Sequence, residues 1–184
     1  MIKQHILQGK EADLEILNKV FNLGDKPISI TEEHLNLCLK IYNKRTTLAL
    51  PVPRTKHVIP FTKLVGRESY EEKNKVSGCY CIRAFFKGCS KVTGLRGIES
   101  YVGQASHLGH RVKQHAKGID TSTKSFISSS KGKKLEVDLF IVDKDLKIPG
   151  NLTIKQFITI LEQYLIIKLK PTINKKLLAT PGIM

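Results

Sequence analysis

The stretch ESYVGQASHLGHRVKQH, residues 99–115, predicts a strand that turns directly into a helix. Tyr and Val in its first residues favour extended backbone, and the turn that follows contains Gly, Ser and His. In the helix, Arg111 and His115 lie four residues apart and therefore project from the same side. Taken alone, this pair indicates an ordinary exposed face of a basic protein. Next to a strand-to-helix turn, it could form a site.

The chain around this stretch has the pattern of a small antiparallel sheet. Residues 77–86, SGCYCIRAFF, predict a strand that pairs with residues 99–103 in a hairpin, and residues 135–142, LEVDLFIV, predict a third strand. A long helix follows over residues 152–170 and ends at a proline. We therefore expect an α+β fold in residues 76–184, with a small three-stranded antiparallel sheet flanked by helices.

The first 75 residues have a different character. Two segments before residue 45 carry apolar side chains at helical spacing, and Ser29 or Thr31 is the candidate N-cap of the second. We interpret residues 1–47 as a helical N-terminal extension. Residues 48–75 are rich in proline and then in charge, so we interpret them as a connector that lies along the domain or along a ligand.

The charge balance is strongly basic. The chain has 31 Lys and Arg against 16 Asp and Glu, which gives a net charge of +15. Residues 77–184 hold 18 of these basic and 7 of these acidic residues, so this part alone carries +11. A domain of this charge attracts polyanions, and nucleic acid is the usual one. The alternative interpretation is a soluble surface that is merely rich in lysine.

Cysteine usage and apolar runs bear on location. The four cysteines form no C-x-x-C pair, so no zinc ribbon is expected, and Cys79 and Cys81 should share one face of a strand as reduced thiols. No signal peptide and no run long enough to span a bilayer is present. We expect an intracellular protein without a membrane partner. A composition rich in Ile, Lys, Asn and Leu favours an organellar, mitochondrial origin.

Glu162 is the one acidic residue in the helix predicted over residues 152–170. It lies beside an apolar stripe made of Ile154, Phe157, Ile158, Leu161 and Leu165. A carboxylate next to a core face is expected to be solvated, paired or bound to a metal. On its own, Glu162 is best interpreted as a surface group paired with Lys155 or Lys168.

Taken together and in order, these pieces resemble the GIY-YIG nuclease family. The two tripeptides that name the family correspond to Gly78-Cys79-Tyr80 and Tyr101-Val102-Gly103, on the paired strands of the hairpin. The family continues with a helix that bears Arg and often His, then a helical Glu, then a Pro-x-x-Asn element. The matching residues are Arg111, His115, Glu162, Pro171 and Asn174. The resemblance covers roughly residues 76–178.

The resemblance implies a role for each residue of a catalytic site. The six residues are Tyr80, Tyr101, Arg111, His115, Glu162 and Asn174. Glu162 would be the single protein ligand of Mg²⁺ (or Mn²⁺), and Arg111 would hold the scissile phosphate. Tyr80 would be the general base or orient the water, with Tyr101 assisting. His115 would relay a proton or contact phosphate, and Asn174 would brace the site or, alternatively, cap a helix end.

The chain departs from the family pattern between the two tyrosines, which 20 residues separate here. The family usually has about half as many, and the surplus predicts a basic loop from Lys87 to Ile98 beside the site. That loop would either add phosphate contacts or obstruct the site. The residues expected to bind nucleic acid are Lys87, Lys91, Arg96, Gln104, Ser106, His107, Lys113, Lys131, Lys133 and Lys134.

Two functions follow from this reading. The first is a metal-dependent endonuclease that hydrolyses phosphodiester bonds of double-stranded DNA, of homing type and intron- or organelle-encoded. A repair nuclease or a restriction enzyme is a variant of the same class. The second is a catalytically weak protein that binds structured RNA or a ribonucleoprotein such as a ribosome. The presence of all six site residues favours the enzyme.

Overall fold

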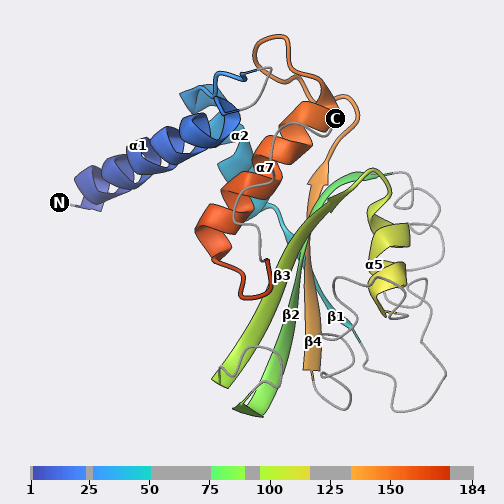
Figure 1. The fold of residues 1–184 in the computed structure, drawn as a ribbon. Coiled ribbons are helices and arrows are strands. Elements are labelled where there is room, and N and C mark those ends of the chain that lie inside the picture. The colour runs from blue at the N-terminus through green and yellow to red at the C-terminus, as the bar shows by residue number, and fades with distance from the viewer. Residues whose placement is uncertain (1, 24–26, 51–75, 90–95, 117–133, 175–184) are drawn as a thin grey trace.

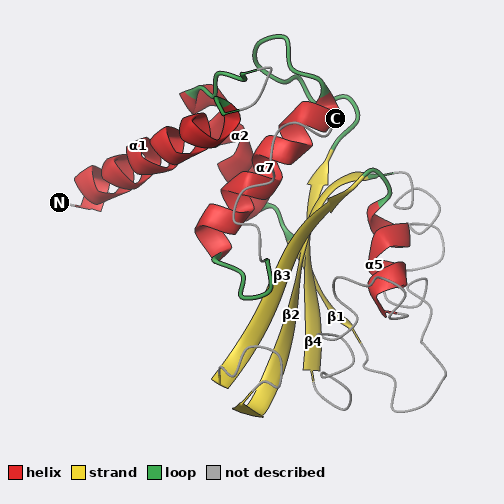
Figure 2. Ribbon diagram, viewed as in Figure 1, coloured by secondary structure: helices red, strands yellow, loops and turns green. Residues whose placement is uncertain are grey.

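The computed structural model describes residues 2–23, 27–50, 76–89, 96–116 and 134–174. Within these ranges the protein has an α+β fold, in which one antiparallel sheet lies between helices (Figures 1 and 2). In chain order the elements are α1 (Ile2–Phe21), α2 (Glu32–Asn43), β1 (Thr46–Leu50), β2 (Ser77–Cys89), β3 (Arg96–Ala105), α5 (Leu108–Ala116), β4 (Lys134–Val142) and α7 (Ile154–Leu169).

The four strands pair in the order β1-β4-β2-β3, and every pair is antiparallel. The α+β class is confirmed, but the predicted strand number was wrong, because β1 adds a fourth strand. Its sequence, TTLAL, suits a strand, and it pairs with β4 from Thr46 opposite Leu139 to Leu50 opposite Leu135. The prediction missed this strand because the prolines that begin at Pro51 dominated the pattern at its end.

Different helices cover the two faces of the sheet. Figures 1 and 2 show α5 on one side, and α7 with α1 and α2 on the other. Successive strand residues point to opposite faces. Tyr80 and Ile82 of β2 therefore pack in the apolar cluster that contains residues of α5, whereas Cys79 and Cys81 pack in the cluster that contains α7. Burial on both faces explains why β2 is apolar along much of its length.

The two N-terminal helices share a core with the sheet. Leu17 of α1 and Cys38 of α2 lie in one apolar cluster with Phe140 of β4 and Phe157 of α7. The predicted helix pair is confirmed, although α1 begins at Ile2 and is longer than predicted. The extension therefore packs as an integral part of the described fold.

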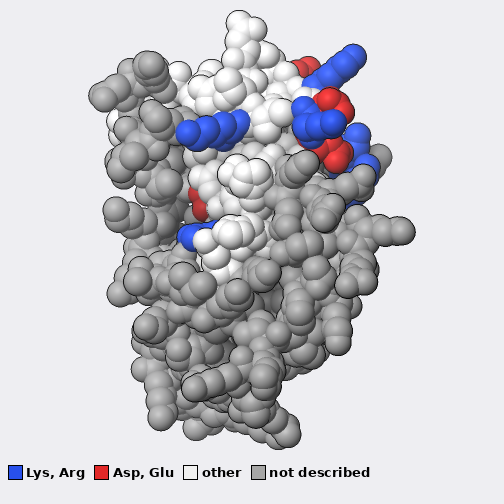
Figure 3. All heavy atoms as spheres, turned by 90° about the vertical axis from the view of Figure 1, so that its right-hand side faces the viewer, with Lys and Arg blue, Asp and Glu red and all other residues white. Residues whose placement is uncertain are grey.

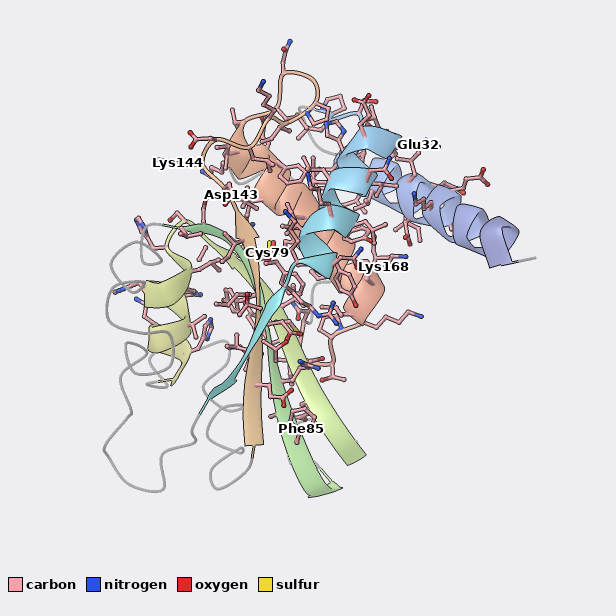
Figure 4. The ribbon with its side chains drawn as sticks, turned by 180° about the vertical axis from the view of Figure 1, so that it is seen from behind. Glu32, Cys79, Phe85, Asp143, Lys144 and Lys168 are labelled. Atoms are coloured by element: carbon pink, nitrogen blue, oxygen red, sulfur yellow. The ribbon has the colours of Figure 1, made fainter. Side chains whose placement is uncertain are left out.

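A buried histidine joins α2 to the turn before α7. Thr31, one of the two candidate N-caps, caps α2, and its backbone N–H donates to Nδ1 of His34 at 3.0 Å. Because Nδ1 accepts, Nε2 carries the proton and donates to the carbonyl of Pro149 at 2.9 Å. Figure 4 shows α2, with Glu32 at its start, alongside α7.

The hairpin strands β2 and β3 continue well beyond their predicted ends. β2 reaches Cys89 and β3 begins at Arg96, with a shift in register after Phe85. The prediction of a loop over residues 87–98 was therefore wrong in its described part, because continued pairing satisfies the backbone groups there. Cys89 lies about 30 Å along the strand from Tyr80.

The described cysteines and the lengths of the described helices agree with the predictions from the sequence. Cys38, Cys79 and Cys81 are free, buried thiols, and the last two share a face of β2 as predicted. Burial raises the pKa of Cys38 and of Cys81 to about 12, so both thiols stay protonated and inert. Among the helices of the described ranges, none is long and apolar enough to cross a membrane.

Candidate functional site

Tyr80 and His115 meet in the interior between β2 and α5. The Tyr80 hydroxyl lies 2.6 Å from Nε2 of His115, and the two side chains are 1% and 0% exposed. Tyr101, half-buried on β3, completes a cluster of three rings, with its centroid 6.2 Å from that of Tyr80 and 5.8 Å from that of His115. The hydrogen bond allows a proton to pass directly between hydroxyl and imidazole.

Gly103 makes room for the side chain of Tyr80. The two residues face each other across the β2–β3 ladder. A Cβ at position 103 would lie 2.5 Å from the Tyr80 hydroxyl oxygen and 2.7 Å from Cζ. The Tyr80 ring is buried among other core side chains. The glycine of the second tripeptide is therefore needed because of the tyrosine of the first.

Arg111 lies one turn before His115 on α5. Its Nη1 donates to Oε1 of Gln114 at 3.2 Å, and the side chain is half-buried. The interpretation of Arg111 and His115 as an exposed pair is wrong for His115, which is fully buried. The helix turns the imidazole toward the sheet because Leu108 and Val112, on the same side, pack in the core.

Glu162 and Gln104 join α7 to the edge strand β3. Nε2 of Gln104 donates to Oε2 of Glu162 at 3.0 Å. Burial raises the pKa of Glu162 to about 7, and the hydrogen bond from Gln104 acts in the opposite direction. Neither predicted lysine pairs with this carboxylate in the described part of the chain, since Lys168 pairs with Asp13 of α1 instead.

The segment after α7 closes the free edge of β3. The Asn174 side chain accepts a hydrogen bond from the Val102 N–H at 2.9 Å and donates one to the Val102 carbonyl at 2.8 Å. Two residues earlier on β3, both backbone groups of Ser100 are also bound. The Ile173 N–H donates to the Ser100 carbonyl, and Oγ1 of Thr172 accepts from the Ser100 N–H, both at 3.0 Å. Asn174 thus imitates a strand residue, and its alternative role as a helix cap is not what these bonds show.

Four consecutive residues of β3, from Tyr101 to Gln104, gather most of the predicted site. Tyr101 and Gly103 adjoin Tyr80, Tyr101 adjoins His115, Val102 binds Asn174, and Gln104 binds Glu162. The tyrosines and His115 lie on the α5 face of the sheet, whereas Glu162 lies on the α7 face. The predicted residues therefore surround an edge strand and do not line one pocket.

The expected nucleic-acid contacts are only partly described. Ser106 and His107, in the turn between β3 and α5, are exposed. Lys87 lies in β2, Arg96 in β3, Lys113 in α5 and Lys134 in β4, with side chains outside the description, and Lys91, Lys131 and Lys133 lie outside the described residues altogether. Figure 3 shows the α5 side of the molecule, where some of the described Lys and Arg side chains stand among uncharged ones and others lie beside Asp and Glu side chains.

Glu162 fits a hard divalent cation. The described residues include no group of three His, Cys, Asp or Glu side chains that could bind a metal. A site at Glu162 would therefore use one carboxylate with water and phosphate oxygens, which is how proteins often hold Mg²⁺. Burial destabilises the charged carboxylate, and its one hydrogen bond comes from a neutral amide. A cation would supply the compensating charge.

The sequence prediction missed the partner of Glu162. Gln104 was assigned to nucleic-acid binding, whereas its amide holds the carboxylate. Strand alternation offered a signal: Gln104 must face away from Tyr101 and Gly103, toward the other side of the sheet. The contribution of Thr172 and Ile173 at the β3 edge had no such signal.

Comparisons with known proteins leave the family open. No family model, no curated protein and no solved structure matches the chain. A functional assignment therefore depends on the geometry of the site and on the resemblance of its motifs.

Proposed function

We propose that this chain is a metal-dependent endonuclease of the GIY-YIG type that hydrolyses phosphodiester bonds of double-stranded DNA. The observation that carries the proposal is that residues 101–104 of β3 contact four of the other predicted catalytic residues, Tyr80, His115, Glu162 and Asn174. Those residues come from β2, α5, α7 and the segment after α7, which are far apart in the sequence. The net charge of +15 supports a polyanionic substrate.

The composition favours one form of this enzyme. A chain rich in Ile, Lys and Asn and without Trp suits an intron- or organelle-encoded homing endonuclease that works in mitochondria. Such an enzyme would meet DNA in an intracellular compartment, where its thiols stay reduced.

Arg111 and the start of α5 are the proposed phosphate-binding elements. Arg111 borders solvent, and its planar guanidinium can hold two non-bridging phosphate oxygens at once. The exposed turn at Ser106 and His107 leads into the helix, so a phosphate bound by Arg111 would lie near the N-terminal end of α5. As the P–O bond to the leaving oxygen breaks, Arg111 would compensate the growing negative charge.

Tyr80 and His115 are the proposed proton-handling pair. The Tyr80 hydroxyl would take the proton of the attacking water while its own proton passes to Nε2 of His115. This transfer requires the neutral form of His115 with Nε2 unprotonated. Tyr101 packs against both rings and would keep them in register.

Glu162 is the proposed ligand of Mg²⁺ or Mn²⁺. When bound, the metal would supply Lewis-acid polarisation of the phosphate and stabilise the leaving oxygen. The chain contributes a half-buried carboxylate that accepts a hydrogen bond from Gln104. Asn174 would hold β3 in place through Val102, between the two halves of the site.

Plasmid cleavage tests this proposal. The full chain is incubated with supercoiled DNA and Mg²⁺, and Glu162→Gln and Arg111→Ala are expected to lower the cleavage rate at least about 100-fold. Glu33→Gln and Arg45→Ala are matched controls, because both residues are exposed and lie on the N-terminal side of the fold. These controls should cleave at the wild-type rate.

Two results would contradict the enzyme. One is DNA binding by the wild type without nicking in either Mg²⁺ or Mn²⁺. The other is undiminished cleavage by Glu162→Gln.

One observation favours a second candidate function, a catalytically weak protein that binds structured RNA or a ribosome. Tyr80 is 1% exposed and its hydroxyl is already hydrogen-bonded to His115, as in a purely structural tyrosine. Filter binding in low salt with DNA and with structured RNA separates the two functions. Preferential RNA binding that is unchanged in Arg111→Ala and Glu162→Gln, without cleavage, would support the binding protein.

A further inference from the structure

Gln104 is placed to control the orientation of the Glu162 carboxylate. An ionised carboxylate only accepts hydrogen bonds, so the amide nitrogen of Gln104 must face it and the amide oxygen must point elsewhere. The bond from Nε2 to Oε2 measures 3.0 Å. It occupies one carboxylate oxygen and leaves Oε1 as the atom available to another ligand.

The neutral character of this donor matters. A lysine or arginine at the same place would also fix the carboxylate, but its charge would compete with a divalent cation. No lysine or arginine takes this place in the described part of the chain, where Glu162 has no ion pair. Lys168, on the same helix, binds Asp13 instead. An amide orients the carboxylate and keeps its negative charge uncompensated.

Gln104 itself is held rigidly. Its backbone pairs with Cys79 of β2, which is fully buried beneath α7 and donates to the Ile158 carbonyl of that helix. Figure 4 shows Cys79 between the sheet and α7. Two residues before Gln104, the Asn174 side chain fixes both backbone groups of Val102. The donor therefore approaches Glu162 from a strand that is anchored on both sides.

We propose that Gln104 is a positioning residue that orients Glu162 so that one carboxylate oxygen is directed to a divalent cation. This inference rests on the proposed function, since it assumes that Glu162 binds the metal. It gives Gln104 a different task from direct contact with nucleic acid. Outer partners of metal ligands typically change affinity by about 10–100-fold when they are removed.

Mn²⁺ binding to the full chain tests the inference without measuring cleavage. Free Mn²⁺ is counted by its EPR signal in titrations of the wild type, Gln104→Ala, Gln104→Lys and Glu162→Gln. Gln104→Ala should weaken Mn²⁺ binding about 10-fold or more. Gln104→Lys should abolish binding while keeping or raising the melting temperature, because the new ammonium pairs with Glu162. Glu162→Gln should abolish binding.

Gln156→Ala is the matched control. Gln156 lies on α7, the helix that carries Glu162. Its Oε1 accepts a hydrogen bond of 2.9 Å from the backbone N–H of Thr153 in the capping box. Its loss should lower the melting temperature and leave Mn²⁺ affinity unchanged. If Gln104 had only a structural role, Gln104→Ala would likewise lower the melting temperature and leave Mn²⁺ affinity unchanged.

The outcomes distinguish the positioning role of Gln104 from the metal site at Glu162. If Glu162→Gln abolishes binding while Gln104→Ala and Gln104→Lys bind like the wild type, Gln104 does not position Glu162, and the metal site stands. If the wild type fails to bind Mn²⁺, or Glu162→Gln binds as tightly, the metal site and the role of Gln104 both fail. A loss in both Gln104 variants with folding intact supports the positioning role.

Discussion

The hydroxyl of Tyr80 and Nε2 of His115 form a hydrogen bond of 2.6 Å inside the protein, although 35 positions separate them in the chain. Both side chains are buried, with Tyr80 1% and His115 0% exposed. The bond ties β2 to the last turn of α5 and places the two groups where a proton can move between them. A substitution of either residue alone therefore removes this hydrogen bond from the buried polar atom of the other residue.

Tyr80→Phe and His115→Ala should therefore be coupled in stability. Removing one partner leaves the other buried without this hydrogen bond, which costs about 1–3 kcal/mol. The double variant should lose less than the sum of the single losses, with a coupling of about 1–2 kcal/mol. Urea unfolding of the four proteins measures this difference. Simple additivity would show that the bond contributes nothing in solution.

Gly103→Ala should disturb the site through Tyr80. The new Cβ would lie 2.5 Å from the buried hydroxyl oxygen, so the ring or the strand must move, at a cost of about 1–3 kcal/mol. Gly9→Ala is the matched control, because nothing lies within 4 Å of a Cβ there. In the middle of α1 that change should stabilise the protein by about 0.5–1 kcal/mol. Equal effects of the two substitutions would contradict the close packing at Gly103.

Glu162 should make the metal-free protein less stable as the pH rises. Burial raises its pKa from 4.5 to about 7, so the folded state retains the proton over a pH range in which the unfolded chain has lost it. Its stabilising contribution is complete below pH 4.5 and is lost as the pH rises through 7. Over that range, the wild type should lose about 3 kcal/mol of folding stability relative to Glu162→Gln.

Denaturant unfolding at several pH values, with EDTA present, measures this loss. Glu33→Gln, at an exposed position in α2, is the control and should lose stability with pH as the wild type does. A constant difference between wild type and Glu162→Gln across the range would show that the carboxylate titrates normally. Adding Mg²⁺ at pH 8 should reverse the loss if the cation binds the folded state.

Asn174→Ala should open the edge of β3. The substitution removes two hydrogen bonds to Val102, so its amide proton should exchange with solvent at least about 10-fold faster, and stability should fall by about 1–2 kcal/mol. Hydrogen exchange followed by NMR measures the first effect. Asn151→Ala, in the exposed turn before α7, should leave Val102 protected. Unchanged protection in Asn174→Ala would contradict the edge contact.

Local patterns were sufficient for most elements of the fold. Apolar alternation predicted β2, β3 and β4, helical spacing predicted the helices, and Thr31 was correctly among the candidate caps. The first strand was missed because five residues beside a run of prolines carry little local signal. The lengths of β2 and β3 were underestimated for a related reason, since pairing beyond Phe85 depends on the partner strand and not on the local sequence.

The spatial arrangement of the predicted site residues was only partly predictable. Hairpin register places Tyr80 opposite Gly103 and beside Tyr101, which the two tripeptides alone suggest. The contact between Gln104 and Glu162 depends on how α7 crosses the sheet, and that crossing is set by the apolar faces of several elements together. The separation of the tyrosines from Glu162 by the sheet itself has the same origin.

The core that α1 and α2 share with β4 and α7 makes the N-terminal helices inseparable from the rest of the fold. Residues such as Leu17 and Cys38 fill the same interior as Phe140 and Phe157, and His34 reaches the turn that precedes α7. The first two helices therefore cannot be exchanged as a cassette, because their removal would uncover one side of the sheet.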